Sequence, residues 1–225
     1  MMKRILAALG LLAVLASLTL PAFAIEDLAT RQAHKKLEAQ KYPQQASEAL
    51  KNNNPDLAIE LFTKAIDSKA FKDQPQTLGE IYFGRGNAYR IKKDCVSAVA
   101  DYTKAAETLN RGDLYFARAA CYIELKQDDK ALADLDAAIK IDPEAALYRG
   151  ARCVLLFNRK DFAGALPDCE KALAAKPDDK NMLIAVSQAA EQVGNKQRAA
   201  EAYRKLLAVD PGNPVAIEGL KRVGG

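Results

Sequence analysis

The chain has 225 residues, 28% of them charged, and a formal net charge of +4 at pH 7. A net charge this small creates no strong positive field, so we expect no nucleic-acid partner. Tryptophan is absent and there are only 12 glycines, a composition that suits closely packed helices. A chain of this length is expected to form one or two domains.

Residues 1–24 have the pattern of a cleaved export signal. Lys3 and Arg4 supply positive charge, an apolar run over residues 5–20 follows, and Ala22-Phe23-Ala24 provides small residues where a signal peptidase reads them. The alternative is an uncleaved membrane anchor, but the run is short for a span of ~20 residues. No cysteine lies near the cleavage point, which excludes a lipoprotein. We therefore expect cleavage after Ala24 and a soluble periplasmic chain without membrane contact.

Three evenly spaced prolines set the organisation of the remaining chain. Pro143, Pro177 and Pro211 lie 34 residues apart, and the segments that end at them read KALADLDAAIKIDP, GALPDCEKALAAKP and RAAEAYRKLLAVDP. In each segment a small residue, a bulky residue four positions later and an apolar residue three positions after that share one helical face. A period near 34 indicates an array of helix-turn-helix units. The triplets begin at Ala58, Ala98, Ala131, Ala165 and Ala199.

This pattern resembles the tetratricopeptide repeat family over about residues 39–211. The resemblance implies an all-α fold, a right-handed α-solenoid of five helix-turn-helix hairpins, with a leading helix over 25–38 and a capping helix within 212–225. The chain departs from the family pattern at Pro43 and in a six-residue excess around 68–76. The repeats would start near Ala39, Gly79, Gly112, Ala146 and Lys180.

The three middle repeats share an arginine on the first helix and an aspartate on the second. The first and fifth repeats lack both, so the two residue types occur together or not at all. We expect a series of ion pairs that register packed helices rather than contacts to a ligand. Each arginine would pair either within its repeat or with the preceding aspartate. The residues are Arg85, Arg118 and Arg152, with Asp101, Asp134 and Asp168.

Four cysteines in an oxidising compartment are candidates for disulfide bonds. In the repeat frame Cys95 begins a second helix beside the late part of the next first helix, which holds Cys121. Cys153 and Cys169 lie on the two helices of one hairpin. The frame therefore favours these two pairings, while the alternative is that all four are small core residues. We expect no metal site, because no C-x-x-C motif occurs and no histidine lies nearby.

Residues able to perform chemistry are few. The only histidine, His34, lies in the polar leading helix, and hydrolase and metal-binding motifs are absent. Gly84-Arg85-Gly86 begins like a dinucleotide-binding loop, but it falls within a helix of the repeat frame. We therefore expect a protein that is not an enzyme and has no cofactor and no metal.

In the family that the chain resembles, the first helices line a concave groove that binds extended or helical peptides. The corresponding residues form an apolar stripe with few charges, as expected of a binding surface. Each of them could instead make ordinary contacts between neighbouring helices. The implied partner-binding residues are Phe83, Asn87, Arg90, Phe116, Ala120, Ile123, Leu147, Gly150, Val154, Phe157, Ile184, Gln188 and Glu191.

We expect Phe116, Val154 and Phe157 to form the centre of this surface. The family's carboxylate-clamp pattern for chaperone tails is not met, because only Asn87 matches it. The predicted function is a periplasmic protein-protein interaction scaffold or adaptor that binds a protein or peptide in its apolar groove. The alternative is a periplasmic holdase-type chaperone, which would suppress the aggregation of unrelated unfolded clients instead of binding one or few partners.

Overall fold

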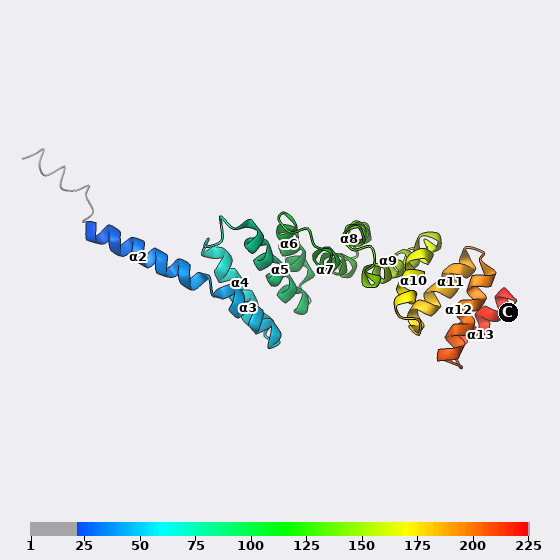
Figure 1. The fold of residues 1–225 in the computed structure, drawn as a ribbon. Coiled ribbons are helices and arrows are strands. Elements are labelled where there is room, and N and C mark those ends of the chain that lie inside the picture. The colour runs from blue at the N-terminus through cyan, green and yellow to red at the C-terminus, as the bar shows by residue number, and fades with distance from the viewer. Residues whose placement is uncertain (1–21, 225) are drawn as a thin grey trace, which may run out of the picture. The chain divides into compact units, whose positions relative to one another are not determined.

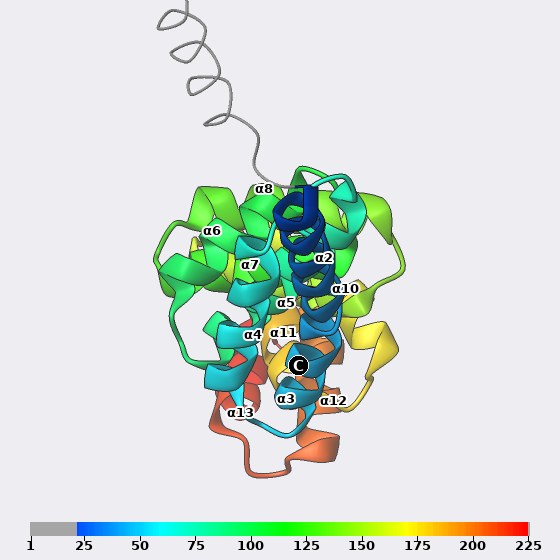
Figure 2. The same cartoon turned by 90° about the vertical axis from the view of Figure 1, so that its left-hand side faces the viewer.

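The computed structural model describes residues 22–224, and every regular element in this part of the chain is an α-helix (Figures 1 and 2). Two compact units are present, one up to Ile81 and one from Tyr82 onward, with the boundary inside α5. Of the predicted export signal over 1–24, residues 1–21 lie outside the described residues. The first unit contains α2 (Ala22–Ala39), α3 (Tyr42–Lys51), α4 (Pro55–Asp67) and the start of α5 (Pro75–Ile91).

The second unit continues the series of antiparallel hairpins to the C-terminus. Its first helices α7, α9 and α11 begin at Gly112, Ala146 and Lys180, where the repeat frame places the starts of three repeats. The last helix, α13, packs on α12 and α11, as expected of a capping helix. The elements are α6 (Cys95–Ala106), α7 (Gly112–Glu124), α8 (Asp128–Ile141), α9 (Ala146–Asn158), α10 (Phe162–Ala175), α11 (Lys180–Gln192), α12 (Lys196–Val209) and α13 (Pro214–Val223).

Each hairpin turns through one residue in the left-handed backbone region followed by the N-cap of the second helix. In the second hairpin Lys93 has φ 62°, the N–H of Asp94 donates to Tyr89 O at 3.0 Å, and the Asp94 carboxylate accepts from Ser97 N at 3.0 Å. These contacts satisfy backbone groups that a helix end leaves unpaired. The same turn recurs with φ above zero at Asn53, Lys126, Lys160 and Gly194.

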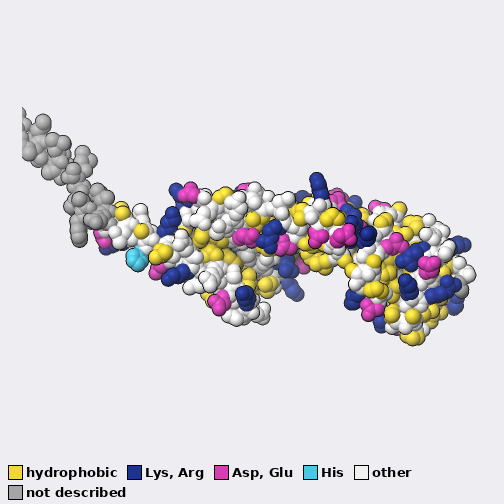
Figure 3. Space-filling view, viewed as in Figure 1, with side chains coloured by type: hydrophobic (Ala, Val, Ile, Leu, Met, Phe, Trp, Pro, Cys, Tyr) yellow, Lys and Arg dark blue, Asp and Glu magenta, His cyan; other side chains and the backbone are white. Residues whose placement is uncertain are grey.

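The predicted triplets form the core. Their small residues, Ala58 to Ala199, are all 0% exposed, and the bulky residues Tyr102 and Tyr203 are also 0% exposed. A Cβ at Gly86 would lie 2.7 Å from Tyr102 Cε1, so the second hairpin closes only around a glycine. Apart from the buried Asp101, Asp134 and Asp168, charged side chains lie mostly outside this core, and both signs are interspersed over the face seen in Figure 3.

The three arginine-aspartate pairs form within repeats. Arg118 Nε and Nη2 donate to the two carboxylate oxygens of Asp134 at 2.8 and 2.7 Å, and Arg85 contacts Asp101 in the same two-pronged way. Asp134 is only 6% exposed. The remaining nitrogen of Arg118 donates to Thr103 on the preceding α6 at 3.2 Å. The arginine thus fixes the two helices of its own hairpin and also contacts the previous repeat.

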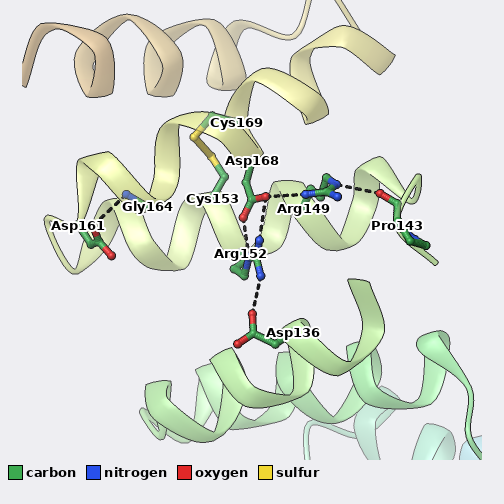
Figure 4. Close-up of polar contacts among 9 residues, drawn as sticks. All are labelled: Asp136, Pro143, Arg149, Arg152, Cys153, Asp161, Gly164, Asp168 and Cys169. Carbon is green, nitrogen blue, oxygen red and sulfur yellow. Dashed lines mark hydrogen bonds and ion pairs between the residues drawn. A yellow bond between two sulfur atoms is a disulfide. The ribbon is translucent and has the colours of Figure 1, made fainter. Parts of the chain in front are cut away.

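The fourth repeat carries an enlarged version of this pair, shown in Figure 4. Asp168, 1% exposed, accepts from Arg152 and from Arg149 Nη1, the latter at 3.0 Å. Arg152 also contacts Asp136 on the preceding α8. In the other two repeats the arginine instead lies over tyrosine rings, as Arg118 does over Tyr115 at 5.6 Å from the ring centroid.

One of the two predicted disulfides is present. Cys153 on α9 and Cys169 on α10 are bonded, with their Cα atoms 5.1 Å apart, so the hairpin that contains Asp168 is also closed covalently (Figure 4). The other predicted bond is absent, because Cys95 and Cys121 are buried free thiols. Burial raises the pKa of both thiols, and the Cys95 thiol donates a hydrogen bond to Glu124 Oε2 at 3.2 Å. Both groups therefore stay protonated, the form that does not attack a disulfide.

The ion pairs predict a specific pattern of stability losses. Asp134→Ala leaves Arg118 without its buried partner and should lower the free energy of unfolding by ~3 kcal/mol. In urea denaturation, a double-mutant cycle should show strong coupling of Asp134 to Arg118 and little to Arg152. A loss below about 1 kcal/mol would mean that the pair behaves as a solvated surface pair.

The cysteine assignment predicts the outcome of thiol counting. Alkylation of denatured, unreduced protein should modify Cys95 and Cys121 and leave Cys153 and Cys169 unmodified, as peptide mass spectrometry would show. Reduction before alkylation should expose all four. Four reactive thiols without reduction would contradict the disulfide.

Candidate binding groove

An apolar groove of about 600 Å³ lies along α9 in the second unit. It is formed by the end of α7, the length of α9, the end of α10 and the start of α11. Its lining is mostly apolar or small, with a few polar residues at the rim. The lining residues are Ile123, Ala146, Leu147, Gly150, Ala151, Val154, Leu155, Asn158, Ala172, Ala175, Lys176, Asp179 and Met182.

The floor of the groove is a stripe along one face of α9. Leu147, Gly150 and Val154 are three and four residues apart, so they lie on the same side of the helix. Leu147 is 63% exposed and Val154 45% exposed, although both are large apolar side chains. A Cβ at Gly150 would lie 3.4 Å from Ala172 Cβ, so small residues let α10 approach closely here. The groove therefore presents apolar side chains that the fold itself does not bury.

The charges at the rim neutralise one another. Asp179 caps α11 by accepting from Asn181 N at 3.0 Å and Met182 N at 3.1 Å, and Lys176 Nζ lies 3.5 Å from its carboxylate. The backbone N–H of Met182 is the main cause that lowers the pKa of Asp179. Because this carboxylate is already hydrogen-bonded and paired, the rim has little charge to offer a ligand. Apolar contact would dominate binding.

A second, polar hollow of about 420 Å³ adjoins the groove, and Asn158 lines both. Phe157 and Phe162 meet edge to face in its wall, with ring centroids 5.2 Å apart. On the opposite side Glu191 accepts from Arg222 Nε at 2.6 Å and from the Tyr203 hydroxyl at 2.6 Å. The bond from Arg222 is the main cause that lowers the pKa of Glu191. The apolar groove therefore ends at a hydrogen-bonded polar cluster.

The structure brings together part of the predicted partner-binding set. Ile123, Leu147, Gly150 and Val154 line the apolar groove, and Phe157, Gln188 and Glu191 line the polar hollow. Gln188 and Glu191 belong to α11 and Phe157 to α9, the first helices of successive repeats.

Other predicted residues do not line either hollow. Phe116 packs on Tyr148, with ring centroids 5.3 Å apart, and Phe83 packs on Tyr102 beneath Arg111. Asn87 accepts from the Tyr102 hydroxyl at 2.9 Å, which is a structural contact. The structure therefore places Val154 in the groove and Phe157 beside it, but it packs Phe116, the third residue of the predicted centre, against a neighbouring aromatic ring.

Three further predicted residues lie outside both linings, and one of them is the half-buried Ala120. Arg90 is exposed and Ile184 packs on the core of the last repeats. The lining residues that the sequence analysis missed include Ala172 and Ala175 at the end of α10, and Lys176 and Asp179 on the connection to α11. The repeat frame assigns the groove to first helices, so the C-terminal end of a second helix was not considered. The Pro-Asp-Asp sequence before α11 was the available signal, since aspartate is a preferred N-cap.

Within residues 22–224 no group of three or more histidine, cysteine, aspartate or glutamate side chains could hold a metal ion. Over the same residues, no helix has the length and apolar character needed to cross a bilayer.

Comparison with family models gives matches described as tetratricopeptide repeat. One model matches residues 112–145, and a second matches residues 44–113 and 153–214. Together they cover most of the described chain and include the helices that line the groove.

Two curated relatives show similarity over a part of their length. The chain is 34% identical over 146 residues to tetratricopeptide repeat protein 4 of Homo sapiens, covering 61% of this chain and 36% of that protein. It is 31% identical over 139 residues to small glutamine-rich tetratricopeptide repeat-containing protein 2 of Saccharomyces cerevisiae, covering 61% and 30%. The chain thus spans about a third of the length of these relatives.

Solved structures share the fold. YrrB, described as a TPR protein with an unusual peptide-binding site, superposes with a TM-score of 0.70 at 20% identity, covering 89% of this chain and 98% of that chain. MamA superposes with a TM-score of 0.66 at 17% identity, covering 77% and 92%.

Proposed function

Because the chain belongs to the tetratricopeptide repeat family, whose members are protein-protein interaction scaffolds, we propose that it is a periplasmic adaptor that binds a protein or peptide segment in the groove along α9. The observation that carries this proposal is the exposure of Leu147 and Val154, at 63% and 45%. Large apolar groups kept in contact with water in a hollow mark an interaction site. The proposed role is binding without catalysis.

The form of the groove supports a peptide ligand. Its volume of about 600 Å³ accommodates a few apolar side chains rather than a folded domain. Because the rim charges are already paired, the groove can accept peptides of different sequence. The adjoining polar hollow offers hydrogen-bonding groups to the main chain or polar side chains of the same peptide. That YrrB is described as having a peptide-binding site is consistent with such a ligand on this fold.

The export pattern supports a periplasmic location for this adaptor. Secreted material should start at Ile25, because Ala22-Phe23-Ala24 fits a signal peptidase site. Intact-mass measurement of the protein from a periplasmic fraction would show the new N-terminus. Retention of Met1 in a membrane fraction would overturn the proposed location.

The groove proposal predicts a separation of binding from folding. The double substitution Leu147→Ser and Val154→Ser should abolish capture of the native partner, because central apolar groups dominate interface energy. The melting temperature should change by no more than about 2 °C, because both side chains are solvent-exposed. Affinity capture from a periplasmic extract, with quantitative mass spectrometry and thermal melting, gives both readouts.

Val96 on α6 provides the matched control. It is apolar and 69% exposed but lies outside the groove, so Val96→Ser should leave capture intact. Unchanged capture by the double variant would place the binding site elsewhere. Recovery of many unrelated clients, together with suppression of their aggregation, would favour the holdase alternative over an adaptor with one or few partners.

A further inference from the structure

A third hollow, separate from the groove and from the polar hollow beside it, lies in the first unit. It is open to solvent, has a volume of about 820 Å³ and is lined by residues of α2, the start of α3, the end of α4 and the connection that follows α4. The leading helix and this long connection are the two segments that exceed the repeat pattern. Neither is needed to stack one hairpin on the next, yet both contribute residues to the same hollow.

Basic side chains gather in this hollow. It is lined by Lys35 and Lys36 of α2, Lys64 of α4, and Lys69 and Lys72 of the connection. Residues 22–81 contain eight lysines and arginines and nine aspartates and glutamates. Five of the eight basic residues line the hollow, but only two of the nine acidic ones do, Glu38 and Asp67. The unit as a whole is nearly neutral, so the positive charge is local.

The connection holds its two lysines in a defined position. The Ser68 hydroxyl donates to Ala65 O at 2.6 Å and accepts from Ala70 N at 3.1 Å. Ala70 and Phe71 are each 5% exposed and anchor the segment. Lys69, with φ 56°, comes just before these anchors and Lys72 just after them, and both are exposed side chains that line the hollow. An anchored segment that displays two cations loses less entropy on binding than a free loop.

On α2, Lys35 and Lys36 lie on the same helical face as Gln32 and Ala39, at spacings of three and four residues. Both lysines are exposed. Of the five lysines, Lys64 is paired with Glu60 at 2.5 Å, so the remaining four supply the charge available to a ligand. The half-buried Tyr42 contributes less polar surface to the hollow, and Ala39 is buried at its base, 1% exposed.

We propose that this hollow binds an acidic peptide segment, with the lysines contacting its carboxylates and its small side chains lying over Ala39, Tyr42 and Ala70. A concave site fits a protruding segment better than a flat lipid surface. Glu38 and Asp67 in the lining repel the continuous charge of a nucleic-acid backbone, whereas a peptide can place its carboxylates next to lysines only.

The test measures binding of a short fluorescein-labelled peptide of alternating glutamate and alanine to the full chain by fluorescence anisotropy at low salt. In Lys69→Gln/Lys72→Gln the Kd should rise about tenfold, the effect of two lost charge contacts. The matched control Lys41→Gln/Lys51→Gln removes the same charge from exposed positions of the same unit outside the hollow. Its Kd should rise by less than about twofold.

Other arms identify the surface and the class of ligand. Leu147→Ser/Val154→Ser should bind the acidic peptide like the native chain, and a peptide with glutamine in place of glutamate should not bind. Absence of acidic-peptide binding, or equal losses in the hollow and control variants, would overturn the proposal. It would also be overturned if oligothymidine or vesicles containing phosphatidylglycerol bound in a Lys69- and Lys72-dependent way while the peptide did not.

Discussion

The buried arginine-aspartate pair is the contact on which the middle of this chain depends. A carboxylate that is 6% exposed or less is tolerated only where a cation meets it with good geometry, and the two-pronged bond of Arg118 to Asp134 meets that condition. This ion pair sets the axial register of the second helix of the hairpin against the first. Because Arg118 and Arg152 also contact the preceding repeat, the same residue sets the position of one hairpin against the next.

The groove follows from this registration. The ion pair of Arg152 with Asp168 and the disulfide between Cys153 and Cys169 hold one face of α9 against α10. The other face carries Leu147 and Val154, and no helix of the second unit covers them. Gly150 keeps this face shallow enough to form a hollow rather than a ridge. The polar hollow that contains Glu191 adjoins the groove at Asn158.

The periodic features were predictable from sequence, and features that depend on a single neighbour were not. The spacing of four and three residues identified the buried triplets, and the repeat frame gave the starts of α7, α9 and α11. The frame could not choose between two aspartates for each arginine, since both lie one helix away. It also treated Phe116 and Val154 alike, because only the position of Tyr148 decides that the phenylalanine is covered and the valine is not.

The absence of the arginine-aspartate pair from the first and last repeats makes the stability of the chain uneven along its length. In a linear array each hairpin gains free energy only from its own contacts and its nearest neighbours, so local opening is easiest where those contacts are fewest. The last repeat compensates through the bonds of Glu191 to Tyr203 and Arg222, which connect α11 to α12 and α13. The hairpin of α3 and α4 has no such pair among the described contacts. Amide hydrogens of α3 and α4 would exchange with solvent through local opening of that hairpin. Because this opening does not involve α9, the groove keeps its shape.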